Sequence, residues 1–145
     1  MGAALLRHAL AAEPEPLRSL PVISAGVSAR TGETMTPHSV TALKKAGIDA
    51  SRHASRLLTQ DLLDQAVLVL CMTEQHRALI EASADPAPRN LYLFRELMPP
   101  GSCREIADPY GGTLPAYETS RDEMVEAIPS LVAFLKTQMG PRGRP

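Results

Sequence analysis

The residues best suited to chemistry in this sequence lie in the segment 107–112, which has the sequence Ala-Asp-Pro-Tyr-Gly-Gly. Proline restricts the residue before it to extended or turn conformations, so Asp108 is predicted to have a fixed backbone. Gly111 and Gly112 permit a tight turn and a close approach of the backbone to another group. A carboxylate held in this way can serve as a general acid. Because Asp-Pro and Gly-Gly pairs are also common in ordinary turns, the segment by itself leaves both interpretations open.

Cysteine offers a second candidate chemistry. The segment from Cys71 to Arg77 has the spacing Cys-x5-Arg and lies where a predicted strand meets a predicted helix. A phosphate-binding loop needs glycine and small residues so that backbone N–H groups converge on the anion. This segment has no glycine, and Glu74 would repel a phosphate dianion, so Cys71 is predicted to be a structural thiol of the core. Cys103, in a loop without a second thiol near it, is predicted to be a free cysteine.

The elements that must position these residues alternate between helix and strand. Apolar residues at helical spacing predict a helix over 3–11, and Thr36 followed by Pro37 predicts the start of a second one. The unbroken apolar run over 66–72 is typical of a strand buried on both faces. Further strands are predicted over 21–27 and 90–94, and further helices over 59–65, 74–84 and from 119 onward. Pro129 is expected to kink or break the last helix.

Strands separated by helices predict an α/β fold of three layers, in which a doubly wound parallel sheet is flanked by helices. In such folds the ligand lies at the carboxyl ends of the strands. The loops 24–31, 73–74 and 107–112 are therefore predicted to meet there.

The composition excludes several classes of function. The 145 residues are enough for one domain, and the 15 basic and 16 acidic residues give a net charge of −1. No strong field therefore points to a nucleic acid or an anionic membrane as partner. No stretch is long enough to cross a bilayer, and two cysteines are consistent with a reducing cytoplasm. We expect a cytoplasmic domain without a metal or cofactor, and the sequence leaves its oligomeric state open.

Several segments occur in the order found in low-molecular-weight protein phosphatases, and the sequence resembles that family from residue 1 to about residue 138. The resemblance is carried by residues 24–27, 36–38, 53–59, 67–73 and 108–112. It implies a phosphatase that acts on a phosphorylated protein through a cysteinyl-phosphate intermediate. The glycine pair at 111–112 and the segments 71–73 and 119–123 most resemble bacterial members that act on phosphoarginine as well as, or instead of, phosphotyrosine.

This resemblance assigns roles to five residues. Asp108 matches the general acid that protonates the leaving oxygen or nitrogen. Tyr110 matches an aromatic wall of the substrate cleft, and Arg30 lies in the loop at the mouth of that cleft. Ser24 and His53 match residues that hydrogen-bond the phosphate-binding loop and maintain its shape.

The resemblance also implies that part of the site is absent from this sequence. The family's first strand and its Cys-x5-Arg-Ser loop come directly before the helix with which the chain begins, and that strand is central, between those predicted at 21–27 and 66–72. We therefore expect an N-terminally truncated phosphatase domain over 1–138, a disordered tail over 139–145, and no phosphatase activity in the chain as given. The alternative is a non-catalytic, phosphatase-like module that binds or regulates.

Overall fold

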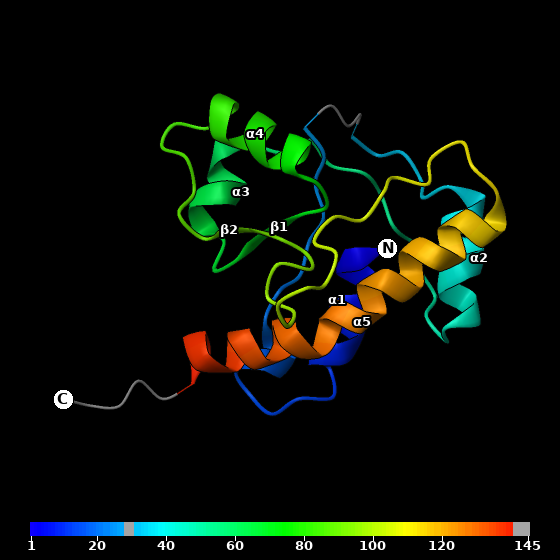
Figure 1. Cartoon of the computed structure of the whole chain (residues 1–145), viewed down its shortest axis with the longest axis horizontal. Coiled ribbons are helices and arrows are strands. Elements are labelled where there is room, and N and C mark those ends of the chain that lie inside the picture. The colour runs from blue at the N-terminus through cyan, green and yellow to red at the C-terminus, as the bar shows by residue number, and fades with distance from the viewer. Residues whose placement is uncertain (28–30, 141–145) are drawn as a thin grey trace.

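A computed structural model describes residues 1–27 and 31–140. The predicted three-layer α/β arrangement is confirmed, because a parallel sheet lies between two groups of helices (Figure 1). The elements in chain order are α1 (Gly2–Leu10), the 3-10 helix η1 (Leu17–Ser19), α2 (Pro37–Lys45), α3 (Gln60–Gln65), β1 (Val69–Cys71), α4 (Glu74–Ser83), β2 (Leu91–Leu93) and α5 (Leu114–Met139). Strand β1 pairs with β2 in parallel, with Val69 opposite Leu91 and Cys71 opposite Leu93.

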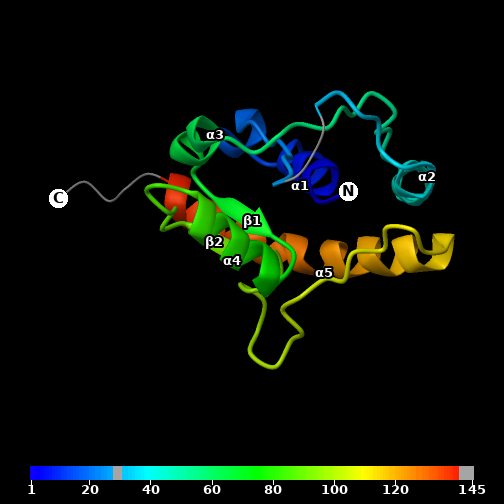
Figure 2. The same cartoon turned by 90° about the horizontal axis from the view of Figure 1, so that it is seen from above.

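Side chains of β1 alternate between the two layers. Cys71 packs into a cluster with Ile80 of α4 on one face of the sheet. Leu70 packs against the larger cluster on the other face, which contains Leu6 of α1 and Leu131 of α5. Figure 1 shows α3 and α4 on one side of the sheet and α1 and α5 on the other. Figure 2, seen from above, shows α5 extending beyond the sheet toward α2. The period of two in a strand thus divides the apolar residues between two cores.

Local chemistry explains where most helices begin. The side-chain oxygens of Thr59 and Thr73 accept the backbone N–H groups of Leu62 and His76, which caps α3 and α4. Such a cap satisfies an amide that has no partner inside the helix. Pro37 occupies the first position of α2, where its missing N–H costs nothing.

The strand predicted over 21–27 is wrong as a regular element of the described chain. Gly26 alone forms an isolated parallel bridge there, in which its N–H donates to the carbonyl of Arg56 at 2.9 Å. Residues 21–25 have no strand partner among the described residues, and the side chain of Ile23 is 48% exposed. A strand needs a hydrogen-bonded neighbour, so an apolar pattern alone does not produce one.

The predicted burial of the whole run 66–72 is also wrong at its start. Val67 is 47% exposed, and the regular strand begins only at Val69. Burial on both faces and both edges requires neighbours on each side of the strand. Among the described residues β1 has a paired strand on one side, namely β2.

Helix α5 begins earlier than predicted and continues through Pro129 to Met139. Figure 1 shows that this helix bends along its length rather than ending. Proline removes one hydrogen bond from a helix and commonly bends it. The fully buried side chains of Ala127 and Leu131 on either side of Pro129 anchor both halves of the helix to the core.

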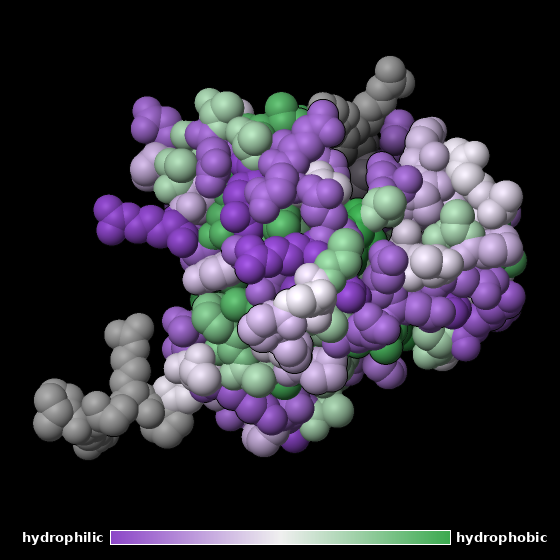
Figure 3. All heavy atoms as spheres, in the orientation of Figure 1, coloured by the Kyte–Doolittle hydropathy of each residue, from purple (hydrophilic) through white to green (hydrophobic). Residues whose placement is uncertain are grey.

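The surface on the face drawn in Figure 3 is mostly hydrophilic, with hydrophobic side chains between the polar ones. Within residues 1–27 and 31–140, no helix combines the length and the apolar character that a membrane span requires.

Candidate active site

The segment 107–112 forms a turn that holds Asp108 by its own backbone. The carboxylate oxygen Oδ1 of Asp108 accepts the N–H of Tyr110 at 3.0 Å. Gly111 has φ of 78°, a conformation that L residues rarely adopt. A Cβ atom on Gly112 would lie 2.8 Å from the carbonyl oxygen of Pro109. Both glycines are therefore required by the shape of this turn.

Two anchors fix the turn to the rest of the domain. The N–H of Ile106 donates to the carbonyl of Met72, directly after β1, at 3.0 Å. The hydroxyl of Ser120 on α5 donates to the carbonyl of Ala107 at 3.2 Å. Asp108 therefore lies at the carboxyl end of β1, where the ligand of an α/β domain is expected.

A hollow of about 390 Å³ opens beside this turn, and we call it the Asp108 hollow. Asp108, Tyr110 and His53 line it together with Glu33 and His76, so four separate parts of the chain meet there. No lysine or arginine of the described residues lines it. Tyr110 is 78% exposed, which leaves its ring available to a ligand.

A second hollow of about 630 Å³ lies next to the first, and we call it the Arg52 hollow. Its lining contains Arg7, Arg52 and Arg56, and Ser24 lies there with His53. In the described chain, Arg52 and Arg56 have no ion pair. Positive charge therefore dominates this hollow.

The Arg52 hollow has one carboxylate among its described lining residues, that of Asp49. The N–H of Ser51 donates to Asp49 Oδ1 at 3.0 Å, and this bond holds the pKa of Asp49 below its ordinary value. The carboxylate is thus turned toward its own loop and offsets only part of the positive charge.

His53 lines both hollows. Burial lowers its pKa, and the positive charges of the chain's N-terminal amine and of Arg7 lower it further. The neutral imidazole is therefore favoured, in which one nitrogen can donate a hydrogen bond and the other can accept one.

Cys71 lies at the end of β1 as a core thiol, as predicted. Its side chain is 6% exposed, and its Sγ donates to the carbonyl of Tyr92 at 3.6 Å. Burial raises the pKa of this thiol, although the guanidinium of Arg77 opposes that effect. Arg77 itself forms an ion pair with Glu96. Cys103 is exposed and free, also as predicted.

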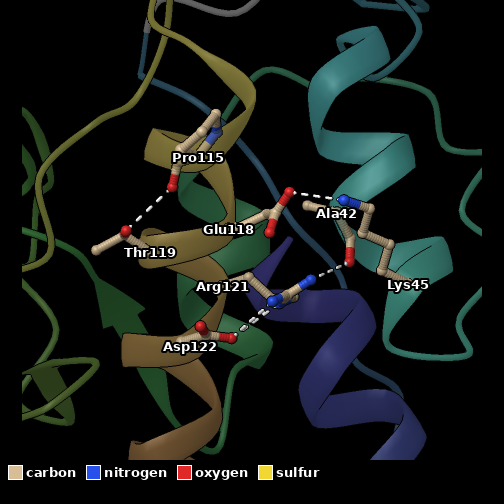
Figure 4. Close-up of polar contacts among 7 residues, drawn as sticks. All are labelled: Ala42, Lys45, Pro115, Glu118, Thr119, Arg121 and Asp122. Atoms are coloured by element: carbon tan, nitrogen blue, oxygen red, sulfur yellow. Dashed lines mark hydrogen bonds and ion pairs between the residues drawn. The ribbon is translucent and has the colours of Figure 1, made fainter.

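Helices α2 and α5 form one wall of the Asp108 hollow, to which α2 contributes Ser39 and α5 contributes Tyr117 and Met124. Figure 4 shows polar contacts between these two helices. The guanidinium of Arg121 on α5 donates to the carbonyl of Ala42 on α2 at 2.8 Å, and Lys45 forms an ion pair with Glu118 at 2.9 Å. Tyr117 is buried between these helices and lines the hollow. These polar contacts thus set the position of the wall.

The structure brings Asp108, Tyr110 and His53 to one hollow, and Ser24 and His53 to the other. Arg30, the fifth predicted site residue, lies outside the described residues. Sequence reasoning missed Glu33, because no motif marks it and only pairing with the distant residues 54–55 brings it to the site. The described residues contain no group of His, Cys, Asp and Glu arranged to hold a metal ion.

Comparison with known proteins gives consistent matches along the chain. A family model described as low molecular weight phosphotyrosine protein phosphatase matches residues 1–140. A protein-arginine-phosphatase of Bacillus subtilis is 38% identical over 115 residues, covering 79% of this chain and 75% of that protein. The solved structure of the YwlE arginine phosphatase from Geobacillus stearothermophilus has a TM-score of 0.81 and 32% identity, covering 99% of this chain and 89% of that one.

A third match is a YwlE arginine phosphatase variant with a phosphorylated active-site serine. It has a TM-score of 0.79 and 34% identity, and the match covers 93% of this chain and 86% of that one.

Proposed function

This chain belongs to the low-molecular-weight phosphotyrosine protein phosphatase family, and from that premise we propose that it removes phosphate from phosphorylated proteins with Asp108 as general acid. The observation that carries this proposal is the meeting of Asp108, Tyr110 and His53 at one hollow in a chain that matches the family over residues 1–140.

The surroundings of Asp108 suit a group that delivers a proton. Its Oδ1 is occupied by the N–H of Tyr110, whereas no bond in the described chain engages Oδ2. A proton carried on Oδ2 can pass to the leaving atom as the bond to phosphorus breaks. Positioned acids of this kind accelerate reactions by roughly 100- to 10,000-fold.

We propose phosphoarginine as the preferred substrate and phosphotyrosine as the second. The relatives named above as arginine phosphatases support this order. The charge of the Asp108 hollow also supports it, because the described part of its lining has no lysine or arginine and so favours a leaving group that is positively charged after protonation. The family description supports phosphotyrosine.

We propose further that Cys71 is not the nucleophile. A buried thiol with a raised pKa supplies little thiolate, and the thiolate is the reactive form. The nucleophile would instead belong to a Cys-x5-Arg loop and a strand contributed by a segment outside the 145 residues. Support comes from residues 21–25, which lack a strand partner, and from the exposed side chain of Ile23 beside the Arg52 hollow.

In this mechanism the thiolate of the added loop attacks phosphorus, and the bond from phosphorus to the leaving nitrogen or oxygen breaks. Asp108 donates its proton to that atom. The YwlE variant with a phosphorylated active-site serine supports a phosphoenzyme intermediate. Water then releases the phosphate, with Asp108 accepting a proton from it. Without the added loop, residues 1–145 are expected to be inactive.

The test uses the protein as its own cell makes it. Its intact mass and N-terminal peptide would be determined, and its turnover of phosphoarginine and phosphotyrosine peptides measured. A mass above 15.6 kDa together with turnover agrees with the proposal. A mass of 15.6 kDa without turnover contradicts it and favours the binding or regulatory module.

A Cys71→Ser variant of the same protein tests the nucleophile separately. We expect it to retain turnover, because Cys71 lies in the core rather than at either hollow. Loss of all activity in a variant with an unchanged circular dichroism spectrum would identify Cys71 as the nucleophile and overturn this part of the proposal.

We also propose a cytoplasmic location. Its support is the pair of cysteines, both free in the structure.

A further inference from the structure

We propose that Glu33 recognises the positively charged guanidinium side of the substrate and is a specificity-determining residue of the site. This inference rests on the proposed phosphatase function, and it adds a residue that no sequence motif marks.

The backbone of Glu33 is fixed at the rim of the Asp108 hollow. Its N–H donates to the hydroxyl of Ser55 at 2.9 Å, and its carbonyl accepts the N–H of Ser55 at 2.7 Å. Gly32 adds a third bond to Ser55 at 2.8 Å, and Thr34 forms an antiparallel bridge with Ala54. Because the backbone of Glu33 and its neighbours is hydrogen-bonded in this way, its side chain starts from a defined position at the rim of the hollow.

The carboxylate of Glu33 is available to a ligand. It lines the Asp108 hollow, and no hydrogen bond or ion pair engages it within the described chain. A solvent-exposed carboxylate that neutralises no neighbouring charge keeps its full attraction for an incoming cation.

The groups that face Glu33 across the hollow are not expected to supply a positive charge that would neutralise its carboxylate. Asp108 is a second carboxylate, while His53 and His76 are the basic side chains of the described lining. Burial lowers the pKa of His53, so its positive form is disfavoured. The lining thus favours a ligand that brings its own positive charge.

Phosphoarginine matches the division of charge between the two hollows. Its phosphoryl group is anionic and suits the side with Arg7, Arg52 and Arg56, whereas its guanidinium side is cationic and suits the side with Asp108 and Glu33. Phosphotyrosine has the same anionic end but a neutral ring. Glu33 therefore distinguishes the two substrates by charge, with a planar guanidinium able to donate two parallel hydrogen bonds to a carboxylate.

Binding of the dephosphorylated product tests the proposed role of Glu33 without requiring turnover. Dissociation constants would be measured for the protein as its cell makes it, with an arginine peptide and with the same peptide carrying citrulline, the neutral analogue. We expect Glu33→Gln to weaken the arginine peptide by about two- to five-fold, the range of an exposed ion pair, and to leave the citrulline peptide unchanged. The matched control is Glu81→Gln, an exposed carboxylate on α4 outside both hollows.

A turnover measurement with the same variants separates this inference from the proposed function. Glu33→Gln is expected to lower kcat/KM for a phosphoarginine peptide by about two- to five-fold while leaving that for a phosphotyrosine peptide unchanged. Equal effects on arginine and citrulline peptides, or on both phosphopeptides, would overturn the role of Glu33. Failure of the wild-type protein to hydrolyse either substrate would instead overturn the proposed function, while the binding result still decides the role of Glu33.

Discussion

The two hollows differ in charge although they lie side by side. The Arg52 hollow is lined by three arginines and one carboxylate of the described residues, and the Asp108 hollow by two carboxylates and no arginine or lysine. They share His53, Met35 and Met1, so they are two ends of one cleft. A cleft divided in this way suits a substrate with an anionic end and a cationic or neutral end, because each end meets complementary charge.

The two ends of the cleft also differ in how their backbone is anchored to the rest of the domain. The Asp108 turn is tied to the end of β1 and to α5 through Ile106 and Ala107. The Arg52 hollow borders residues 21–25, which have no strand partner in the described chain. The Asp108 end is therefore anchored on two sides within the described chain, whereas the Arg52 end borders a segment without a strand partner there.

The largest effect is expected from replacing the acid itself. Asp108→Asn keeps the shape of the turn but cannot donate the proton, so kcat of the natural protein for a phosphoarginine peptide should fall by roughly 100- to 10,000-fold. Asp61→Asn, an exposed carboxylate on α3 outside both hollows, is the control and should leave kcat unchanged. Equal activity of the two variants would contradict the assigned role of Asp108.

The second-largest effect on kcat is expected from changing the turn that positions the carboxylate of Asp108. Gly112→Ala places a Cβ atom 2.8 Å from the carbonyl oxygen of Pro109, so the turn must shift. Displacement of a catalytic group by about 1 Å can cost about 100-fold in rate. Steady-state kinetics should therefore show a large fall in kcat. Wild-type kcat in this variant would mean that the position of Asp108 does not depend on the turn.

Two polar contacts between α2 and α5 are expected to contribute different amounts to the free energy of unfolding. Arg121→Ala leaves the carbonyl of Ala42 without its charged donor, which should lower the free energy of unfolding by about 1–2 kcal/mol. Lys45→Ala removes only an exposed ion pair with Glu118, so the loss should be about 0–1 kcal/mol. Urea denaturation of both variants measures the difference. A larger loss from Lys45→Ala would show that the wall is held by charge pairing at its surface.

The smallest effect is expected in the pH dependence of stability through His53. Its pKa in the folded state lies below the ordinary histidine value of about 6.5, so the unfolded chain binds a proton more readily. Its contribution to stability is therefore complete above about pH 6.5 and is lost as the pH falls through the folded pKa. His53→Gln should flatten the dependence of the unfolding free energy on pH between 7 and 5, as urea denaturation would show. An NMR titration midpoint for His53 at or above that of free histidine would contradict this.

Sequence reasoning succeeded where local chemistry decides the outcome. Pro37 and the capping side chains of Thr59 and Thr73 mark helix starts that the structure contains. The prediction failed where contacts between residues that are distant in sequence determine the structure. Pro129 remains inside α5 because the core holds the helix on both sides of it, and residues 21–25 need a neighbour that their own sequence does not specify.

The residues of the candidate site likewise include some that local sequence predicts and some that it does not. Asp108 and its two glycines are adjacent in sequence, so their turn could be predicted. Glu33 enters the site only through its backbone bonds to Ser55, and such pairing leaves no pattern in a single sequence.

If the Asp108 hollow receives the leaving group and Asp108 protonates it, the importance of Asp108 must depend on how poor the leaving group is. The natural protein and its Asp108→Asn variant would be compared on a series of aryl phosphates whose leaving phenols differ in acidity. We expect the rate lost on substitution to grow as the phenol becomes less acidic, because a poorer leaving group depends more on the donated proton. A loss that is the same for every phenol would show that Asp108 supports the turn rather than the chemistry.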